Sequence, residues 1–404
     1  MAAKTQTLKF KRTVKAPVAE VYRAFTNSTA LREWLSDAAQ VDLHKDGRIH
    51  LWWNNGYYAT GEVTTFVPNK KVAFTWRGRG EPDETQVQVS LAEKNGSTVV
   101  TVAHARIGSG KTWAKAIKAI TRGWERGLEN LQSVIETGHD LRFTLRPMLG
   151  INVGEFNAET AGKLGVPVSE GIHLDGVLET MGAYAAGLRK GDVIVNMAGK
   201  KVTGWPSLTT ALQAHRAGDE VKVVFYRGAE KQTVTMKLSA RPLPDVPATA
   251  QGLADAMRKI DTDLDAQLAK AFAGVTEEET AHEPAPDEWS AKDVLCHLIA
   301  GERDTGAWIA ELIGGHERWY DDWGGNIRTR HAGILATHPT VSSLLDALKC
   351  YEAETVAILA ALPAKFVARK GTFWRMAYSL LQAPEHNDIH LEQIRAAIAS
   401  ARKR

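Results

Sequence analysis

Hydrophobic and polar positions follow two different periods in the first third of the chain. Residues 7–14 alternate between polar and apolar side chains, as in a half-buried β-strand, and Ala16-Pro17 interrupts the pattern before a short amphipathic helix. More strand-like runs follow, separated by turn signals such as Asp46-Gly47 and Asn95-Gly96. From 109 to 137, apolar residues recur at helical spacing, which predicts a long helix with one face on the sheet.

Short strands and glycine turns characterise the middle of the chain, at about 142–242. Gly187 is predicted to end a short helix, Lys190-Gly191-Asp192 to form a turn, and Val193 to begin a core strand. A further helix is expected at about 207–215. The prolines of the following segment, 243–248, predict a stiff linker.

Helical spacing dominates the remaining residues and predicts a bundle of four helices. The expected helices cover about 249–273, 290–313, 340–361 and 373–401, with a long connection over 314–339. Pro384 falls inside the last helix, where its ring would clash with the carbonyl four residues back. That helix is therefore expected either to kink at Pro384 or to restart with Pro384 in its first turn.

The composition fits a protein of two to four domains without a strong charge bias. A chain of 404 residues is too long for one ordinary core. Its 50 Lys and Arg residues nearly balance 47 Asp and Glu residues, which argues against a dedicated nucleic-acid binder. No apolar run is long enough for a membrane span and the start resembles no signal peptide, so we expect a cytoplasmic protein. Two cysteines argue against a disulfide framework.

Two stretches in the first 140 residues are typical of a known superfamily. Residues 14–26 (VKAPVAEVYRAFT) and 31–35 (LREWL) resemble the opening of the SRPBCC (START-like) superfamily, in the branch of activators of the heat-shock protein 90 ATPase. The resemblance implies a helix-grip domain over 1–140, with an apolar cavity between a curved sheet and the long helix. Its partner would be an apolar small molecule, a chaperone or a client. The candidate cavity residues are Trp34, Trp52, Tyr57, Trp76 and Trp113. The alternative is that these aromatic side chains fill an ordinary core.

Three stretches of the middle segment resemble a PDZ domain of the kind that accompanies bacterial serine proteases. They are 149–153 (LGINV), 185–194 (AAGLRKGDVI) and 221–228 (VKVVFYRG). The resemblance implies a PDZ domain over 141–242, whose exposed sheet edge takes up the C-terminal peptide of a partner by strand addition. The candidate peptide-binding residues are Leu149, Gly150, Ile151, Val153, Leu208 and Leu212. The alternative is a spacer domain whose groove is unused or filled by the chain's own tail.

No protease accompanies these modules, because the chain has neither a Gly-x-Ser-x-Gly motif nor a plausible triad. Two histidines four apart, His386 and His390, would lie on one helical face about 5–6 Å apart at Cβ, within reach of one divalent ion. Asn387 stands where a metalloprotease motif has glutamate, which argues against that chemistry as well. Glu302 and Asp304 are candidate acid/base groups or ordinary helix carboxylates.

Residues 289–298 (WSAKDVLCHL) and 386–394 (HNDIHLEQI) resemble the DinB-like family of four-helix bundles. The resemblance implies a bundle over 249–404 that binds a divalent metal through one histidine of the second helix and two of the last. Those positions are His297, His386 and His390. Three imidazoles suit zinc, nickel or iron. Family members include S-transferases and isomerases that use low-molecular-weight bacterial thiols.

The sequence thus predicts a multidomain α+β protein with an SRPBCC helix-grip domain, a β-barrel-like PDZ domain and an all-α four-helix bundle. Two functions of different classes fit this organisation. In one, the bundle is a metal-dependent thiol S-transferase or related detoxification enzyme, and the other modules recruit partners or substrate. In the other, the chain is a non-enzymatic adaptor associated with stress or chaperones.

Overall fold

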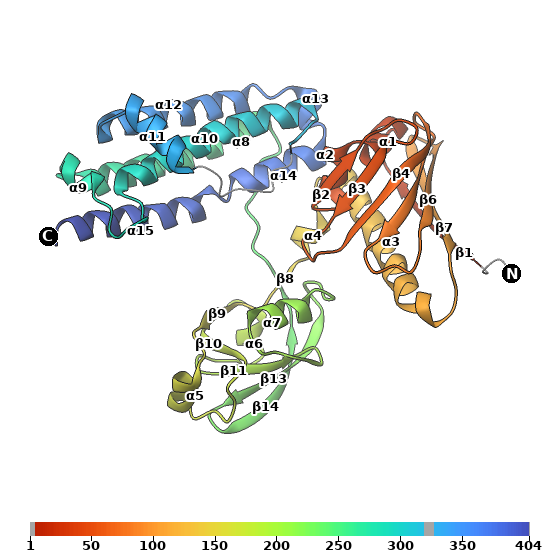
Figure 1. Ribbon diagram of the computed structural model, residues 1–404, viewed down its shortest axis with the longest axis horizontal. Helices are drawn as coiled ribbons and strands as arrows, with labels where there is room; N and C mark the ends of the chain where they lie inside the picture. The colour runs from red at the N-terminus through yellow and green to blue at the C-terminus, as the bar shows by residue number, and fades with distance from the viewer. Residues whose placement is uncertain (1–4, 319–326, 404) are drawn as a thin grey trace. The chain divides into compact units, whose positions relative to one another are not determined.

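The structure is a computed structural model that describes residues 5–318 and 327–403. The chain divides into two compact units, one made of Met1–Asp140 together with Pro244–Arg404 and the other of Leu141–Leu243. The first unit contains a sheet domain and a helical domain, and the second is a smaller sheet domain (Figure 1). The architecture is α+β, as the sequence predicted.

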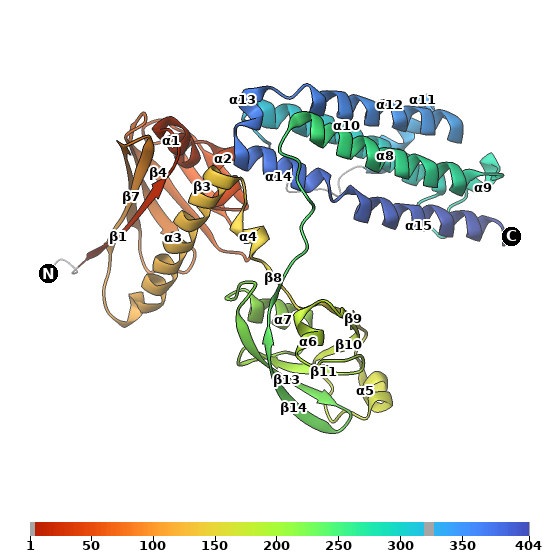
Figure 2. The ribbon, with the colours of Figure 1, turned by 180° about the vertical axis from the view of Figure 1, so that it is seen from behind.

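An antiparallel sheet and one long helix form the N-terminal domain. In the described residues the sheet has seven strands in the order β1-β7-β6-β5-β4-β3-β2. The long helix α3 (Lys111–Thr137) lies against the sheet (Figure 2), and it buries Trp113, Trp124 and Leu131 in the core. The strand and the long helix predicted at 7–14 and 109–137 are confirmed by β1 and α3. The other elements are β1 (Gln6–Val14), α1 (Val18–Thr26), α2 (Ser28–Trp34), β2 (Ala38–Val41), β3 (Arg48–Trp52), β4 (Tyr58–Val67), β5 (Lys71–Gly78), β6 (Thr85–Lys94) and β7 (Ser97–Ile107).

His104 lies in the core of this domain and both of its ring nitrogens are hydrogen-bonded. Trp124 Nε1 donates to His104 Nδ1 at 3.1 Å, so the imidazole proton is on Nε2, 2.7 Å from Thr85 Oγ1. The Thr85 hydroxyl in turn donates to the Trp76 carbonyl at 3.0 Å. Burial lowers the pKa of His104 to about 4, because desolvation disfavours the imidazolium. These hydrogen bonds fix one neutral tautomer.

The second unit is built on an antiparallel sheet with the order β14-β13-β11-β10-β9, and β12 pairs with β11. The strand predicted to begin at Val193 is β11 (Val193–Met197), and β9 (Ile151–Gly154) is an edge strand of the described sheet. Gly150, just before β9, has φ of 75°, and a Cβ there would lie 2.3 Å from Met181 Cβ, so this turn requires glycine. The other elements are α4 (Leu141–Thr144), β8 (Pro147–Met148), α5 (Ala158–Leu164), β10 (Ile172–Val177), α6 (Gly182–Ala185), β12 (Lys200–Lys201), α7 (Trp205–Leu212), β13 (Glu220–Arg227), β14 (Glu230–Lys237) and β15 (Ser239–Ala240).

Four long helices form the bundle: α8 (Ala250–Phe272), α10 (Ala291–Gly314), α12 (Val341–Ala360) and α15 (Ala383–Ala401). Both α8 and α10 pack against α12 and α15, which closes the bundle (Figures 1 and 2). Ser290 begins α10 with a capping box, in which its Oγ accepts from the Asp293 amide and Asp293 Oδ2 accepts from the Ser290 amide. Two short helices, α9 (Glu277–Ala281) and α13 (Ala364–Val367), lie in the connections.

The structure confirms one of the two outcomes predicted for the last helix and adds a helix that was not predicted. The helix predicted over 373–401 is two helices, α14 (Lys370–Leu380) and α15, and Pro384 lies in the first turn of α15. The helix therefore restarts there, because proline needs no N–H at that position. The predicted connection over 314–339 contains a further helix, α11 (Ile327–Thr337), and its residues 319–326 lie outside the described residues.

Helix α14 joins the bundle to the sheet domain within the first unit by packing against α2 and α3. Thr372 Oγ1 donates to the buried carboxylate of Glu33 at 2.6 Å. Glu317 accepts from Arg375 and pairs with Arg32 at 2.9 Å. Because Glu33 and Glu317 are both largely buried, these contacts hold the two domains together as parts of one unit.

Candidate metal centre

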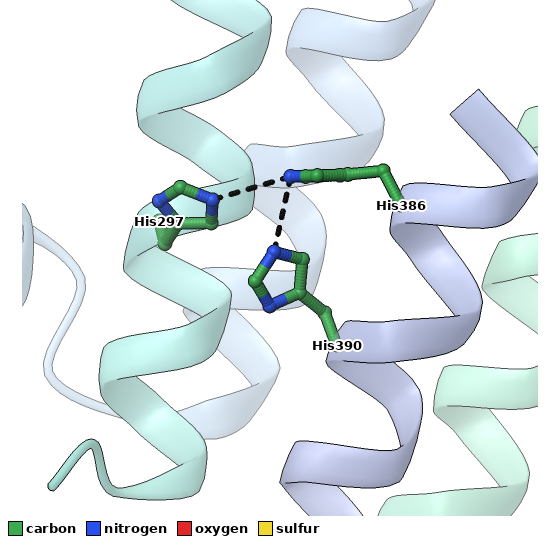
Figure 3. A group of neighbouring side chains, drawn as sticks. All are labelled: His297, His386 and His390. Atoms are coloured by element: carbon green, nitrogen blue, oxygen red, sulfur yellow. Dashed lines mark hydrogen bonds between the residues drawn. The ribbon is translucent and has the colours of Figure 1, made fainter. Parts of the chain in front are cut away.

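Three histidines converge on one point between two helices of the bundle. His297 comes from the second turn of α10, and His386 and His390 come from the first two turns of α15 (Figure 3). The Nε2 atoms of His297 and His386 are 3.4 Å apart, and those of His390 and His386 are 3.0 Å apart. A ligand nitrogen from each of the three rings lies within 4.8 Å of the others. The structure therefore brings together the three residues that the sequence singled out.

These distances fit a shared divalent ion. Imidazole nitrogens at 2.0–2.1 Å from a tetrahedral ion are about 3.3 Å apart, close to the separations found here. Without an ion, three facing imidazoles could make only some of the hydrogen bonds that their nitrogens need. The donor set consists of neutral nitrogen ligands, which suits zinc, nickel or iron better than calcium or magnesium.

Two neighbouring side chains orient and shield the histidines. Gln393 Oε1 lies 3.1 Å from His390 Nδ1, so an N–H on Nδ1 leaves Nε2 free to bind an ion. The indole of Trp289 lies against His297 at 5.0 Å between ring centroids and stacks near His390 at 6.4 Å. Sequence reasoning did not single out either residue. Gln393 could have been found, because it lies one helical turn after His390.

The surroundings favour the uncharged form of His297 and His390. Burial lowers the pKa of His297 to about 4, and the neighbouring His390 and His386 lower it further by charge repulsion. Burial also lowers the pKa of His390, partly offset by its hydrogen bond to Gln393. Neutral imidazole is the form that binds metal, so the electrostatics agree with the geometry.

The carboxylates considered as acid/base groups contact other residues. Glu302 accepts a hydrogen bond from Thr355 Oγ1 at 2.8 Å, and Asp304 pairs with Arg330 at 2.8 Å. Cys296, next to His297 in sequence, is fully buried in the apolar core, where burial raises the pKa of its thiol to about 12. None of these contacts involves the three histidines.

A layer of acidic residues crosses the bundle interior between its two apolar clusters. We call Asp261, Asp265, Glu302 and Glu352 the carboxylate layer. In sequence, Glu352 lies between Leu348 of one cluster and Val356 of the other. Glu352 is 4% exposed, and burial together with the other carboxylates raises its pKa to about 8. Burial and the same neighbours raise the pKa of Asp261 to about 7.

The aromatic residues predicted to line a cavity in the helix-grip domain belong to its core region. Trp34, Trp76 and Trp113 are buried, whereas Trp52 and Tyr57 are half-buried. Trp34 Nε1 donates to the Ala24 carbonyl, Tyr57 donates to Glu81, and Trp76 packs against Trp124. Ligand contact by these side chains stays a prediction.

The predicted peptide-binding residues of the PDZ unit differ in exposure. Leu149 and Leu208 are core residues, at 5% and 1% exposed, and Gly150 forms the buried turn between Leu149 and β9. Ile151 and Leu212 are half-buried, and Val153 on the edge strand is 44% exposed. Only Val153 thus offers a largely accessible side chain. Peptide contact by all six residues stays a prediction.

Comparison with known families identifies three modules in this chain. Residues 15–136 match "Activator of Hsp90 ATPase homolog 1-like protein", residues 147–238 match "PDZ domain", and residues 262–394 match "DinB superfamily". The chain is therefore a multi-module binding protein with an activator-of-Hsp90-ATPase-like domain, a PDZ domain and a DinB-like bundle. No helix in the described residues is long and apolar enough to cross a membrane.

Individual relatives match only parts of the chain. A probable periplasmic serine protease do/HhoA-like protein of Haemophilus influenzae is 32% identical over 110 residues, which are 27% of this chain and 23% of that protein. Activator of 90 kDa heat shock protein ATPase homolog 1 of Mus musculus is 31% identical over 81 residues, 20% of this chain and 23% of that protein. The chain thus spans about a quarter of the length of these curated relatives.

Solved structures resemble a third of the chain. An HSP90 activator from Plasmodium falciparum is 23% identical and covers 32% of this chain and 94% of its own, with a TM-score of 0.28. The Aha1 dimer from Colwellia psychrerythraea is 21% identical and covers 32% of this chain and 96% of its own, with a TM-score of 0.29.

Proposed function

We propose that the helical bundle binds a divalent metal ion through His297, His386 and His390 and catalyses thiol transfer with it. The observation that carries this proposal is the convergence of three imidazole nitrogens from two helices at separations suited to one ion. A bound divalent ion would lower the pKa of a thiol or water molecule at a coordination position that the protein leaves open.

The residues around the histidines would support this chemistry. Gln393 accepts from His390 Nδ1–H and thereby fixes the ring with Nε2 toward the ion. Trp289 covers one side of His297 and His390 and limits the access of water. Zinc, nickel and iron all suit this donor set.

Metal analysis of the purified protein tests the first half of the proposal. We expect about one divalent ion per chain in the wild type and none in His386→Ala. His338→Ala, which changes a histidine of the same domain outside the cluster, should retain the metal. A metal-free wild type, or equal metal content in all three proteins, contradicts the proposal.

Thiol conjugation tests the second half. The metal-loaded protein should transfer a low-molecular-weight thiol to an electrophile such as 1-chloro-2,4-dinitrobenzene, and His297→Ala should abolish the transfer. A protein that binds metal but shows no reaction with any small thiol would leave the metal site without this function.

The other two modules are proposed to recruit partners. The edge strand β9 and its exposed Val153 support the proposal that the PDZ unit takes up an extended C-terminal peptide. The mouse relative is named as an activator of a heat-shock protein ATPase, so the helix-grip domain is proposed to contact a chaperone, its client or an apolar small molecule. A peptide library with free and amidated C-termini checks the PDZ proposal, since amidation should abolish binding. Equal binding of both forms contradicts it.

A further inference from the structure

A cleft of about 400 Å³ opens beside the three histidines. Trp289 and Gln393 both line it, and both also contact the histidines. Its volume is within the range of small-molecule sites. Trp289 and Gln393 are therefore part of both the cleft and the surroundings of the candidate metal centre.

One face of α15 runs from the histidines into the cleft. His386, His390, Gln393 and Ala397 are spaced by four, three and four residues, so their side chains follow one another along the helix. Ala396 and Ala397 line the cleft with small side chains, which leave space beside the large indole of Trp289. A ligand in this cleft would extend along α15 toward the three imidazoles.

Carboxylates supply the charge around this cleft. Asp287 and Glu288 both line it and are exposed, and the residues that line it include no lysine or arginine. Arg328 is one nearby cation: it pairs with Glu283 at 2.8 Å, and its Nη2 also donates to the backbone carbonyl of Glu288 at 3.4 Å. Counting Glu283, Asp287 and Glu288 against Arg328 gives a net charge of −2 for this rim.

We propose that this cleft binds an amphipathic ligand whose apolar body lies on Trp289 and the alanines of α15 and whose ammonium group faces Asp287 and Glu288. The indole supplies a flat apolar surface for the body, and the two carboxylates attract the ammonium group by direct charge pairing. The proposal rests on the proposed function in one respect, because it predicts that the thiol used at the metal centre is cationic. An anionic thiol of the same size would be disfavoured by both carboxylates.

Three ligands of equal size and different charge test the cleft without any metal. Benzylamine, benzyl alcohol and phenylacetate are titrated against the full chain after metal removal, and binding is followed by ligand-observed NMR. We expect benzylamine to bind about fivefold more tightly than benzyl alcohol, and phenylacetate to bind most weakly. Equal binding of the three ligands overturns the proposal.

Surface variants assign the preference to the two carboxylates. Asp287→Asn combined with Glu288→Gln should abolish the preference for benzylamine. Asp287 has φ of 66°, a left-handed conformation that asparagine also adopts readily, so the pair of substitutions should leave the fold intact. Glu354→Gln, which removes an exposed carboxylate of α12, is the matched control and should retain the preference. A preference that survives the double substitution also overturns the proposal.

Failure of the proposed function gives a different result. If the chain binds no metal, the preference among the three metal-free ligands is unaffected. A second outcome is that the chain binds metal and transfers thiols but reacts equally fast with 2-aminoethanethiol and 3-mercaptopropionate. That result supports the proposed metal-dependent thiol transfer and contradicts the proposal that the thiol is cationic.

Discussion

The buried His104 of the helix-grip domain and the histidine cluster of the bundle differ in what their ring nitrogens contact. His104 has hydrogen-bonding partners for both ring nitrogens, supplied by Trp124 and Thr85. In the bundle, the half-buried His297 and the exposed His386 face each other's Nε2 atoms instead, and the buried Glu352 lies close to other carboxylates. Hydrogen bonds from the protein to a buried polar group stabilise the fold. Ring nitrogens or carboxylates that face one another instead indicate that an ion or a proton binds between them.

The largest expected effect comes from breaking the satisfied network. His104→Ala leaves Trp124 N–H without its acceptor and opens a cavity, so it should lower the free energy of unfolding by about 3–5 kcal/mol. Urea denaturation of the helix-grip domain measures the change. His44→Ala is the control, because His44 is 62% exposed and its loss should change stability by less than about 0.5 kcal/mol. Similar stability of the two variants would contradict the stabilising role of the hydrogen bonds to His104.

A smaller effect is expected at the three histidines, and only when metal is present. Zinc at about 100 times its dissociation constant should stabilise the wild type by about 2.7 kcal/mol. His386→Ala should remove that gain but change the metal-free protein by less than about 0.5 kcal/mol, because His386 is exposed. Thermal unfolding with and without zinc measures both values. An equal response of the two proteins to zinc would show that stabilisation does not depend on this site.

The smallest effect is expected in the carboxylate layer, where it depends on pH. The pKa of Glu352 is raised from the ordinary 4.5 to about 8, so the folded state favours the protonated carboxyl. The stability that this group contributes is complete below pH 4.5 and is lost as pH rises through 8. Glu352→Gln should therefore stabilise the bundle by about 1–2 kcal/mol at pH 9 and have little effect at pH 5. Denaturation across this range tests the sign, and a variant that is less stable than wild type at pH 9 contradicts it.

The grouping of the three histidines could be predicted from the sequence, because two of them form a local pattern and the third follows a family pattern. His386 and His390 are one helical turn apart, and His297 occupies the family position on another helix. The restart of the last helix was also foreseeable, since Pro384 allows few other outcomes.

The carboxylate layer and helix α11 could not be predicted, because both depend on contacts between segments that are distant in sequence. Asp261, Glu302 and Glu352 each occupy an ordinary polar position of a helix, and only the packing of three helices brings them into one layer. Helix α11 was missed for a similar reason. Its Arg328 and Arg330 pair with Glu283 and Asp304 from other segments, so its local sequence shows little amphipathic pattern.

The division of the chain into units has a consequence for its synthesis on the ribosome. The second unit is one continuous segment, so it can fold as soon as it is made. The first unit consists of Met1–Asp140 and Pro244–Arg404. The hydrogen bond between Glu33 and Thr372 can therefore form only after more than half of the chain has been translated. At about 5–20 residues per second, that delay is on the order of 20–70 s. During this time the nascent helix-grip domain lacks the contacts that α14 makes with α2 and α3 in the finished protein.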